Sequence, residues 1–75
     1  MALFNPISES ISVTLIKRIR DEYSAHFLYA DIANWCSNNG YTNAEKYFRG
    51  ESVSELSHAL KMETYLYNWG VAYRI

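Results

Sequence analysis

Apolar and polar positions alternate with a helical period along two stretches of the chain. In the first, from about residue 10 to residue 38, one seam repeats at alternating steps of four and three: Leu15, Ile19, Glu22, His26, Tyr29, Ala33 and Cys36. No Gly or Pro occurs in this stretch, so no residue in it breaks a helix. The spacing predicts one long helix over 10–38 that presents a single face to its neighbours.

The second stretch repeats the same period from about residue 44 to residue 69. Its seam consists of Ala44, Phe48, Glu51, Glu55, His58, Met62, Tyr65 and Trp69. Gly50 is the only unfavourable residue inside it, at a cost of about 1 kcal/mol relative to Ala in an exposed helix interior. The spacing predicts a second helix over 44–69.

Turn residues separate and end the two predicted helices. Residues 39–43 form the connection, in which Gly40 is placed to adopt the left-handed conformation that ends a helix. The run from Thr42 to Glu45 matches a capping box, so we expect Thr42 to cap the second helix. Gly70 ends that helix, and residues 70–75 are left as a short tail.

Two helices of this length, each about 40 Å long at ~1.5 Å per residue, must lie antiparallel because the connection is short. The predicted fold class is therefore all-α, with residues 1–75 as a single domain that forms a two-helix hairpin. A lone hairpin would leave much of its aromatic surface in water. We therefore expect two hairpins to dimerise into a four-helix bundle.

Composition supports this need for a partner. A chain of 75 residues builds only a small core, and domains of this size depend on disulfides, a metal ion or oligomerisation. Cys36 is the only cysteine, so an internal disulfide is excluded. The 7 Tyr and 2 Trp residues suit broad packed interfaces.

Charge excludes other classes of partner. The formal net charge is -1, from 7 basic and 8 acidic residues, and neither sign gathers into a phosphate-binding face. Nucleic-acid binding is therefore not expected. No apolar run approaches the ~18 residues of a membrane helix, and the N-terminus lacks the order of a secretory signal. We expect a cytoplasmic protein with no membrane association.

Candidate chemistry comes from polar residues on the predicted seams. Burial of unpaired carboxylates is costly, and a cation would compensate it. Glu55 and His58 are three residues apart and can face one ion. Glu22 precedes the Gly40 connection by about as much as Glu55 follows it, so the three side chains should lie at a similar depth in the hairpin. The pattern predicts a metal site formed by Glu22, Glu55 and His58.

The same residues lie in segments that resemble a known family. The segments are Glu22–Tyr29, Ala33–Cys36, Ala44–Phe48 and Glu55–Ala59. Together they resemble the first half of non-haem ferritins, over about residues 15–70. The matching features are the Glu of the family's first helix, a Tyr seven residues later, and the Glu-x-x-His of its second helix.

The resemblance implies a role for each matching residue. Glu22 would be a terminal carboxylate ligand, Glu55 the bridging carboxylate and His58 the nitrogen ligand of a diiron centre, with Tyr29 beside it. The implied activity is oxidation of Fe(II) to Fe(III) by dioxygen or peroxide. Encapsulated ferritins, also two-helix proteins, complete such a centre across a dimer interface. We therefore expect two iron ions per dimer, in a homodimer or a higher even-numbered homo-oligomer.

Several assignments stay open at this point. His26 is either an accessory ligand or gate, or a hydrogen-bonded seam histidine. Glu51 either has an accessory role, in which it guides iron or contacts a ligand, or is a solvated or salt-bridged acid, and Glu63 is expected on the surface. An alternative function is a non-catalytic half-ferritin module that serves as a structural or assembly subunit of a larger hetero-assembly. The chain could also be part of a longer ferritin.

Overall fold

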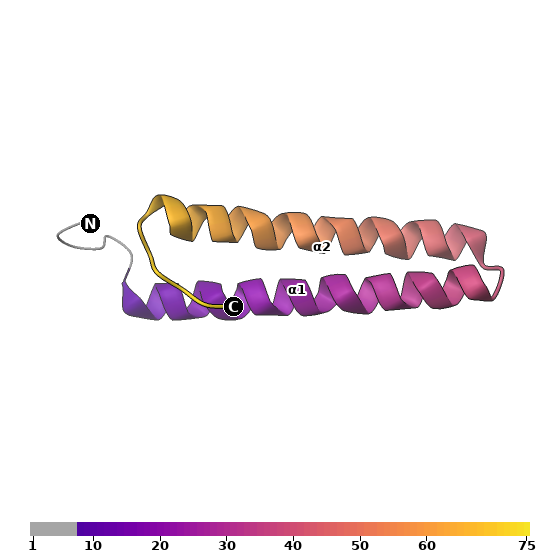
Figure 1. The fold of residues 1–75 in the computed structure, drawn as a ribbon, viewed down its shortest axis with the longest axis horizontal. Helices are drawn as coiled ribbons and strands as arrows, with labels where there is room; N and C mark the ends of the chain where they lie inside the picture. Colours follow the sequence, from indigo (N-terminus) through magenta and orange to yellow (C-terminus); the bar gives the residue numbers. More distant parts are fainter. Residues whose placement is uncertain (1–7) are drawn as a thin grey trace.

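Two long helices make up the fold. The structure is a computed structural model and describes residues 8–75. Helix α1 spans Glu9–Asn38 and helix α2 spans Thr42–Asn68. They run antiparallel and pack side by side along their length (Figure 1). The predicted all-α hairpin is confirmed, and each helix end lies within two residues of its expected position. The expected pairing of two hairpins stays a prediction.

Both helices end at a glycine in the left-handed region. Gly40 has φ 79° and Gly70 has φ 72°. At the first ending, the N–H of Tyr41 donates to the carbonyl of Cys36 at 2.9 Å, which satisfies a carbonyl of the last helical turn. The same pattern recurs around Gly70. The sequence therefore located both helix ends correctly.

The expected capping box at the start of α2 is wrong. Tyr41 holds the N-cap position and makes no capping hydrogen bond with its side chain, and Thr42 is already helical. The carboxylate of Glu45 pairs with Arg49 at 2.8 Å. The physical reason is the short connection. Tyr41 both ends α1 and holds the N-cap position of α2, so Thr42 already lies inside the helix and cannot cap it.

The buried core is narrow. Ile19, Ala59 and Leu66 are fully buried between the helices. The partly buried residues packed against them are Leu15, Ile16, Tyr23, Met62, Val71 and Tyr73. Thirteen large hydrophobic residues remain exposed in the described part of the chain.

The C-terminal segment is part of the packed structure. After Gly70 the chain crosses from the end of α2 to α1, where the C-terminus lies (Figure 1). Arg20 donates to the carbonyl of Arg74 at 3.3 Å, and Tyr73 donates to the carboxylate of Glu63 at 2.9 Å. The segment therefore links the two helices at the open end of the hairpin. The sequence had predicted only a short tail there.

Glu63 is the centre of a small polar cluster and is not the surface acid that we expected. Its carboxylate accepts hydrogen bonds from the hydroxyls of both Tyr23 and Tyr73. The hydrogen bond to Glu63, together with burial and the negative charge of Glu63, raises the pKa of Tyr23 to about 12. Burial, followed by the same hydrogen bond, raises the pKa of Tyr73. Both phenols therefore stay protonated donors at neutral pH.

Within residues 8–75, neither helix is long and apolar enough to cross a membrane.

Candidate metal centre

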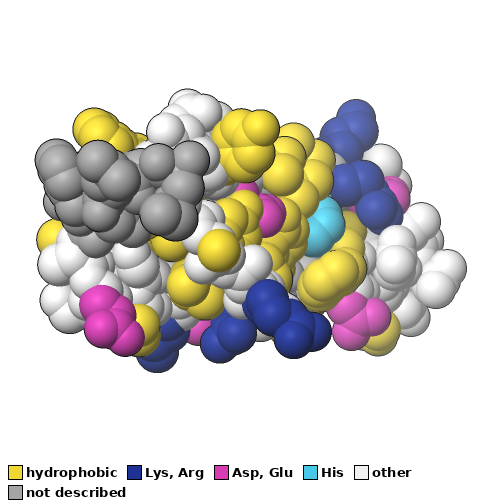
Figure 2. All heavy atoms as spheres, turned by 60° about the vertical axis from the view of Figure 1, so that its left-hand side comes forward, with side chains coloured by type: hydrophobic (Ala, Val, Ile, Leu, Met, Phe, Trp, Pro, Cys, Tyr) yellow, Lys and Arg dark blue, Asp and Glu magenta, His cyan; other side chains and the backbone are white. Residues whose placement is uncertain are grey.

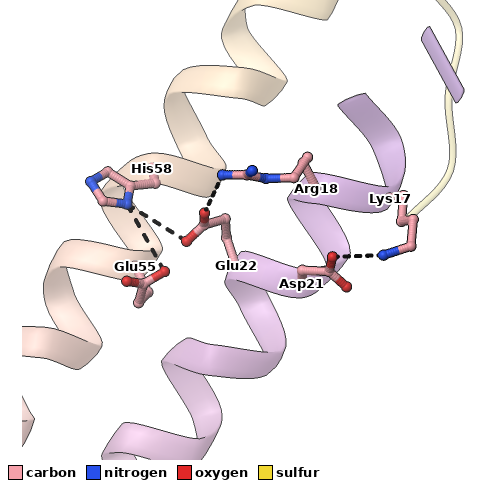
Figure 3. Close-up of polar contacts among 6 residues, drawn as sticks. All are labelled: Lys17, Arg18, Asp21, Glu22, Glu55 and His58. Carbon is pink, nitrogen blue, oxygen red and sulfur yellow. Dashed lines mark hydrogen bonds and ion pairs between the residues drawn. The ribbon is translucent and has the colours of Figure 1, made fainter. Parts of the chain in front are cut away.

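Three side chains from the two helices converge on one face of the hairpin. Glu22 comes from α1, and Glu55 and His58 come from α2 (Figure 3). One possible ligand atom from each lies within 4.8 Å of the others. His58 Nδ1 is 3.6 Å from Glu22 Oε2 and 3.9 Å from Glu55 Oε2. The hairpin therefore brings together the trio that the sequence proposed.

Helix register accounts for this convergence. Glu22 lies 16 residues before the last residue of α1, and His58 lies 16 residues after the first residue of α2. Antiparallel helices joined by a short turn place such positions at the same depth. Glu55, three residues before His58, shares its face of α2. The number of residues between each of these side chains and the turn therefore sets the depth at which they meet.

Burial decreases across the site from one helix to the other. The side chain of Glu22 is 12 % exposed, that of Glu55 is 20 % exposed, and that of His58 is 51 % exposed. The site is therefore closed behind Glu22 and open beside His58.

One oxygen of Glu22 lacks a hydrogen-bond partner. Glu22 Oε2 is buried and accepts no hydrogen bond from residues 8–75, whereas Oε1 accepts from Arg18 at 3.2 Å. An unsatisfied buried group of this kind costs about 1–3 kcal/mol. A cation held between Glu22, Glu55 and His58 would remove that cost. The unpartnered oxygen is thus a specific structural sign that the residues fit a metal ion.

The chemistry of the donors also fits. Two carboxylates and one imidazole offer hard oxygen ligands and one nitrogen ligand, a combination that suits iron, manganese and zinc. His58 turns Nδ1 toward the carboxylates (Figure 3). Neutral imidazole with its proton on Nε2 presents a lone pair at Nδ1. Binding of a metal ion therefore requires His58 to be neutral, and affinity should fall when it is protonated.

Tyr29 lies two turns beyond Glu22 on α1 and is half-buried. Its ring stacks against Phe48 of α2, with the centroids 6.1 Å apart. No hydrogen bond joins its hydroxyl to the three converging side chains within residues 8–75. Its expected place beside the centre therefore stays a prediction.

His26 makes a polar link between the helices. Its Nδ1 lies 2.8 Å from both the carbonyl oxygen and the Oγ of Ser52, and the Ser52 hydroxyl donates to the His26 carbonyl at 2.8 Å. Because that hydroxyl proton is engaged, Nδ1–H of His26 donates to Ser52. This geometry agrees with a hydrogen-bonded seam histidine, and the accessory-ligand role remains only a prediction.

Ser52 was missed by the sequence reasoning. It is only 3 % exposed. The one sequence signal for its burial was that it lies four positions after Phe48, on the inner side of the helix. Glu51, its neighbour, is half-buried and lies outside the converging trio. Its role in guiding iron also stays a prediction.

The open side of the site is bordered by exposed aromatic side chains. Tyr47, Tyr65 and Trp69 lie 11 residues before, 7 after and 11 after His58, which places them on its face of α2. They are 62 %, 46 % and 45 % exposed. In the view of Figure 2, hydrophobic side chains gather near the middle of the molecule, with an acidic side chain and a histidine among them and basic side chains toward the edges. Such a surface is typical of a protein interface.

Comparison with known proteins identifies a family. The family model described as ferritin-like domain matches residues 14–74, a range that includes Glu22, Glu55 and His58. Neither the curated proteins nor the solved structures contain a match to the chain.

Proposed function

The chain belongs to the ferritin-like family, and we propose that it binds Fe(II) and oxidises it to Fe(III) at a site shared between two copies. The observation that carries this proposal is the buried, unpartnered Oε2 of Glu22, which faces Glu55 and His58. Iron is the substrate in this reaction, and dioxygen or peroxide is the oxidant.

Each of the three residues has a distinct task. Glu22 and Glu55 supply carboxylate oxygens, which bind Fe(II) and favour the harder ferric product. His58 supplies a nitrogen at the open edge and must be neutral to do so. Because Glu22 is largely buried, its carboxylate is held in place before iron binds.

A second copy would complete the site. Carboxylate-bridged two-iron sites in helical bundles use one Glu from each of two helices and a Glu-x-x-His pair from each of two others. One hairpin carries one such Glu, Glu22, and one such pair, Glu55 and His58. Two hairpins related by a two-fold axis therefore carry the whole set, for two iron ions per dimer. The exposed aromatic border of the site supports this pairing.

The test is iron oxidation by purified variants. Fe(II) is added without oxygen, and air is then admitted while ferric absorbance is followed. We expect Glu55→Gln and His58→Ala to lose oxidation while circular dichroism shows unchanged helicity. Asp21→Asn is the matched control, because Asp21 is an exposed acid beside Glu22 that pairs with Lys17 away from the site. Full activity in either site variant would refute the assignment.

The alternative is a non-catalytic helical module in a larger assembly. It predicts that the wild-type protein binds no iron and that a different protein covers the exposed aromatic border formed by Tyr47, Tyr65 and Trp69. The same iron titration separates the two functions. The unpartnered Glu22 oxygen favours the metal site, because a purely structural module gains nothing from a buried carboxylate oxygen that accepts no hydrogen bond.

A further inference from the structure

Arg18 makes a contact that the three proposed ligands do not explain. It lies one turn before Glu22 on α1 and donates to Glu22 Oε1 at 3.2 Å. The other oxygen of Glu22, Oε2, faces His58 Nδ1 at 3.6 Å. Figure 3 shows Arg18 on one side of this carboxylate and the two residues of α2 on the other. The two oxygens of Glu22 are therefore assigned to different partners.

We propose that Arg18 is a positioning residue for the metal site: it holds Oε1 of Glu22 so that Oε2 stays directed at Glu55 and His58. This proposal rests on the proposed function, because it concerns how the same site is prepared for a metal ion. Groups that hydrogen-bond to a ligand fix its orientation, and their removal typically weakens metal binding by about 10–100-fold.

A neighbouring ion pair shows why this contact differs from an ordinary surface pair. Lys17 and Asp21 have the same spacing on the same helix and are 2.9 Å apart, but both are well exposed, at 76 % and 56 %. In the pair of Arg18 with Glu22, the carboxylate is only 12 % exposed. A buried carboxylate cannot replace a lost partner with bulk water as Asp21 can. Arg18 therefore determines the orientation of the Glu22 carboxylate, whereas Lys17 has little effect on that of Asp21.

The positive charge of Arg18 acts in the opposite direction, because it repels a bound cation. That repulsion is weakened by solvent, since the Arg18 side chain is 62 % exposed. The hydrogen bond to Oε1 is directional and short in range, and it is lost completely when the guanidinium is removed. We therefore expect the loss of orientation to exceed the relief of repulsion.

The proposal also limits how Glu22 binds the ion. With Oε1 occupied by Arg18, Glu22 offers a single oxygen. Without Arg18, both oxygens are free to chelate or to turn away. Removal of Arg18 should therefore change the coordination of the bound metal as well as its affinity.

Co(II) is a suitable probe, because its visible absorption reports both affinity and coordination. Metal-free wild-type protein and variants are titrated with Co(II). We expect Arg18→Gln and Arg18→Met to bind about tenfold more weakly than wild type, with an altered spectrum. Arg18→Lys, which keeps a cationic donor, should recover most of the affinity. Lys17→Gln, which removes the same charge one residue away, should match wild type.

The outcomes distinguish the two proposals. If wild-type protein binds Co(II) and the Arg18→Gln and Arg18→Met variants bind as tightly as Lys17→Gln, or more tightly, Arg18 does not position Glu22 and the proposed function is unaffected. If wild-type protein binds no Co(II), the metal site itself is refuted and the role of Arg18 with it. Circular dichroism of each variant shows that a weaker affinity does not arise from unfolding.

Discussion

Replacement of Glu22 by Gln should have opposite effects on stability in the absence and presence of metal. In the metal-free protein, Glu22 places a negative charge at 12 % exposure, with one oxygen lacking a partner. Glu22→Gln removes that charge and puts an amide N–H₂ in place of Oε2, on the side of Glu55 and His58. The remaining oxygen of the side chain still accepts from Arg18.

The expected magnitude follows from two terms. Relief of an unsatisfied buried group is worth about 1–3 kcal/mol, and the hydrogen bond from Arg18 weakens by about 1 kcal/mol when its acceptor becomes neutral. The metal-free variant should therefore be more stable than wild type by about 1 kcal/mol, or about 4–8 °C in melting temperature for a domain of this size. Most substitutions at buried positions change stability in the other direction.

Metal should reverse the order. At a free metal concentration 100 times its dissociation constant, binding to the folded state alone adds about 2.7 kcal/mol to the free energy of unfolding. Wild type should gain this stabilisation, whereas Glu22→Gln should gain little of it because a ligand is missing.

The assay is urea unfolding with and without Co(II), at one fixed protein concentration because an oligomer's stability depends on it. Asp21→Asn is the control and should follow wild type in both conditions. A metal-free Glu22→Gln variant that is clearly less stable than wild type, or that gains as much from Co(II), would refute the reasoning.

Three further predictions concern other parts of the molecule. The folded-state pKa of Tyr23, about 12, lies above the ordinary value of 10.0, so its stabilising effect is complete below pH 10 and is lost as pH rises toward 12. Tyr23→Phe should therefore flatten the alkaline fall in unfolding free energy, and a fall as steep as that of wild type would contradict this. Tyr73→Phe removes the hydrogen bond to Glu63 and should lower stability by about 1 kcal/mol in urea unfolding, whereas Tyr67→Phe, at a position that is 77 % exposed, should change it by less than half as much. Trp69→Ser should reduce the oligomer fraction seen by native mass measurement, and Tyr67→Ser on the opposite face should not; equal effects would exclude the aromatic border as the interface.

The helices and the converging trio were predictable because both depend on local spacing. Alternating steps of four and three fix which residues share a helix face, and a glycine-ended turn fixes which depths match. Given these two facts, Glu22, Glu55 and His58 had to approach one another. Their role as ligands remains a prediction that geometry and family membership support.

The features that were missed depend on contacts between segments distant in sequence. Glu63 resembles any surface acid until the C-terminal segment folds back and brings Tyr73 to it. Ser52 becomes important only because His26 lies opposite it. At the start of α2 a local signal was present but was overridden, since Tyr41 was already engaged in ending α1.

The most direct test of the central claim is native mass spectrometry of the protein after addition of Fe(II) without oxygen. If each chain provides half of a site, species with an even number of chains should carry one iron per chain, and single chains should carry none. Single chains that retain iron as well as the dimers do, or dimers that form without retaining iron, would contradict the shared site.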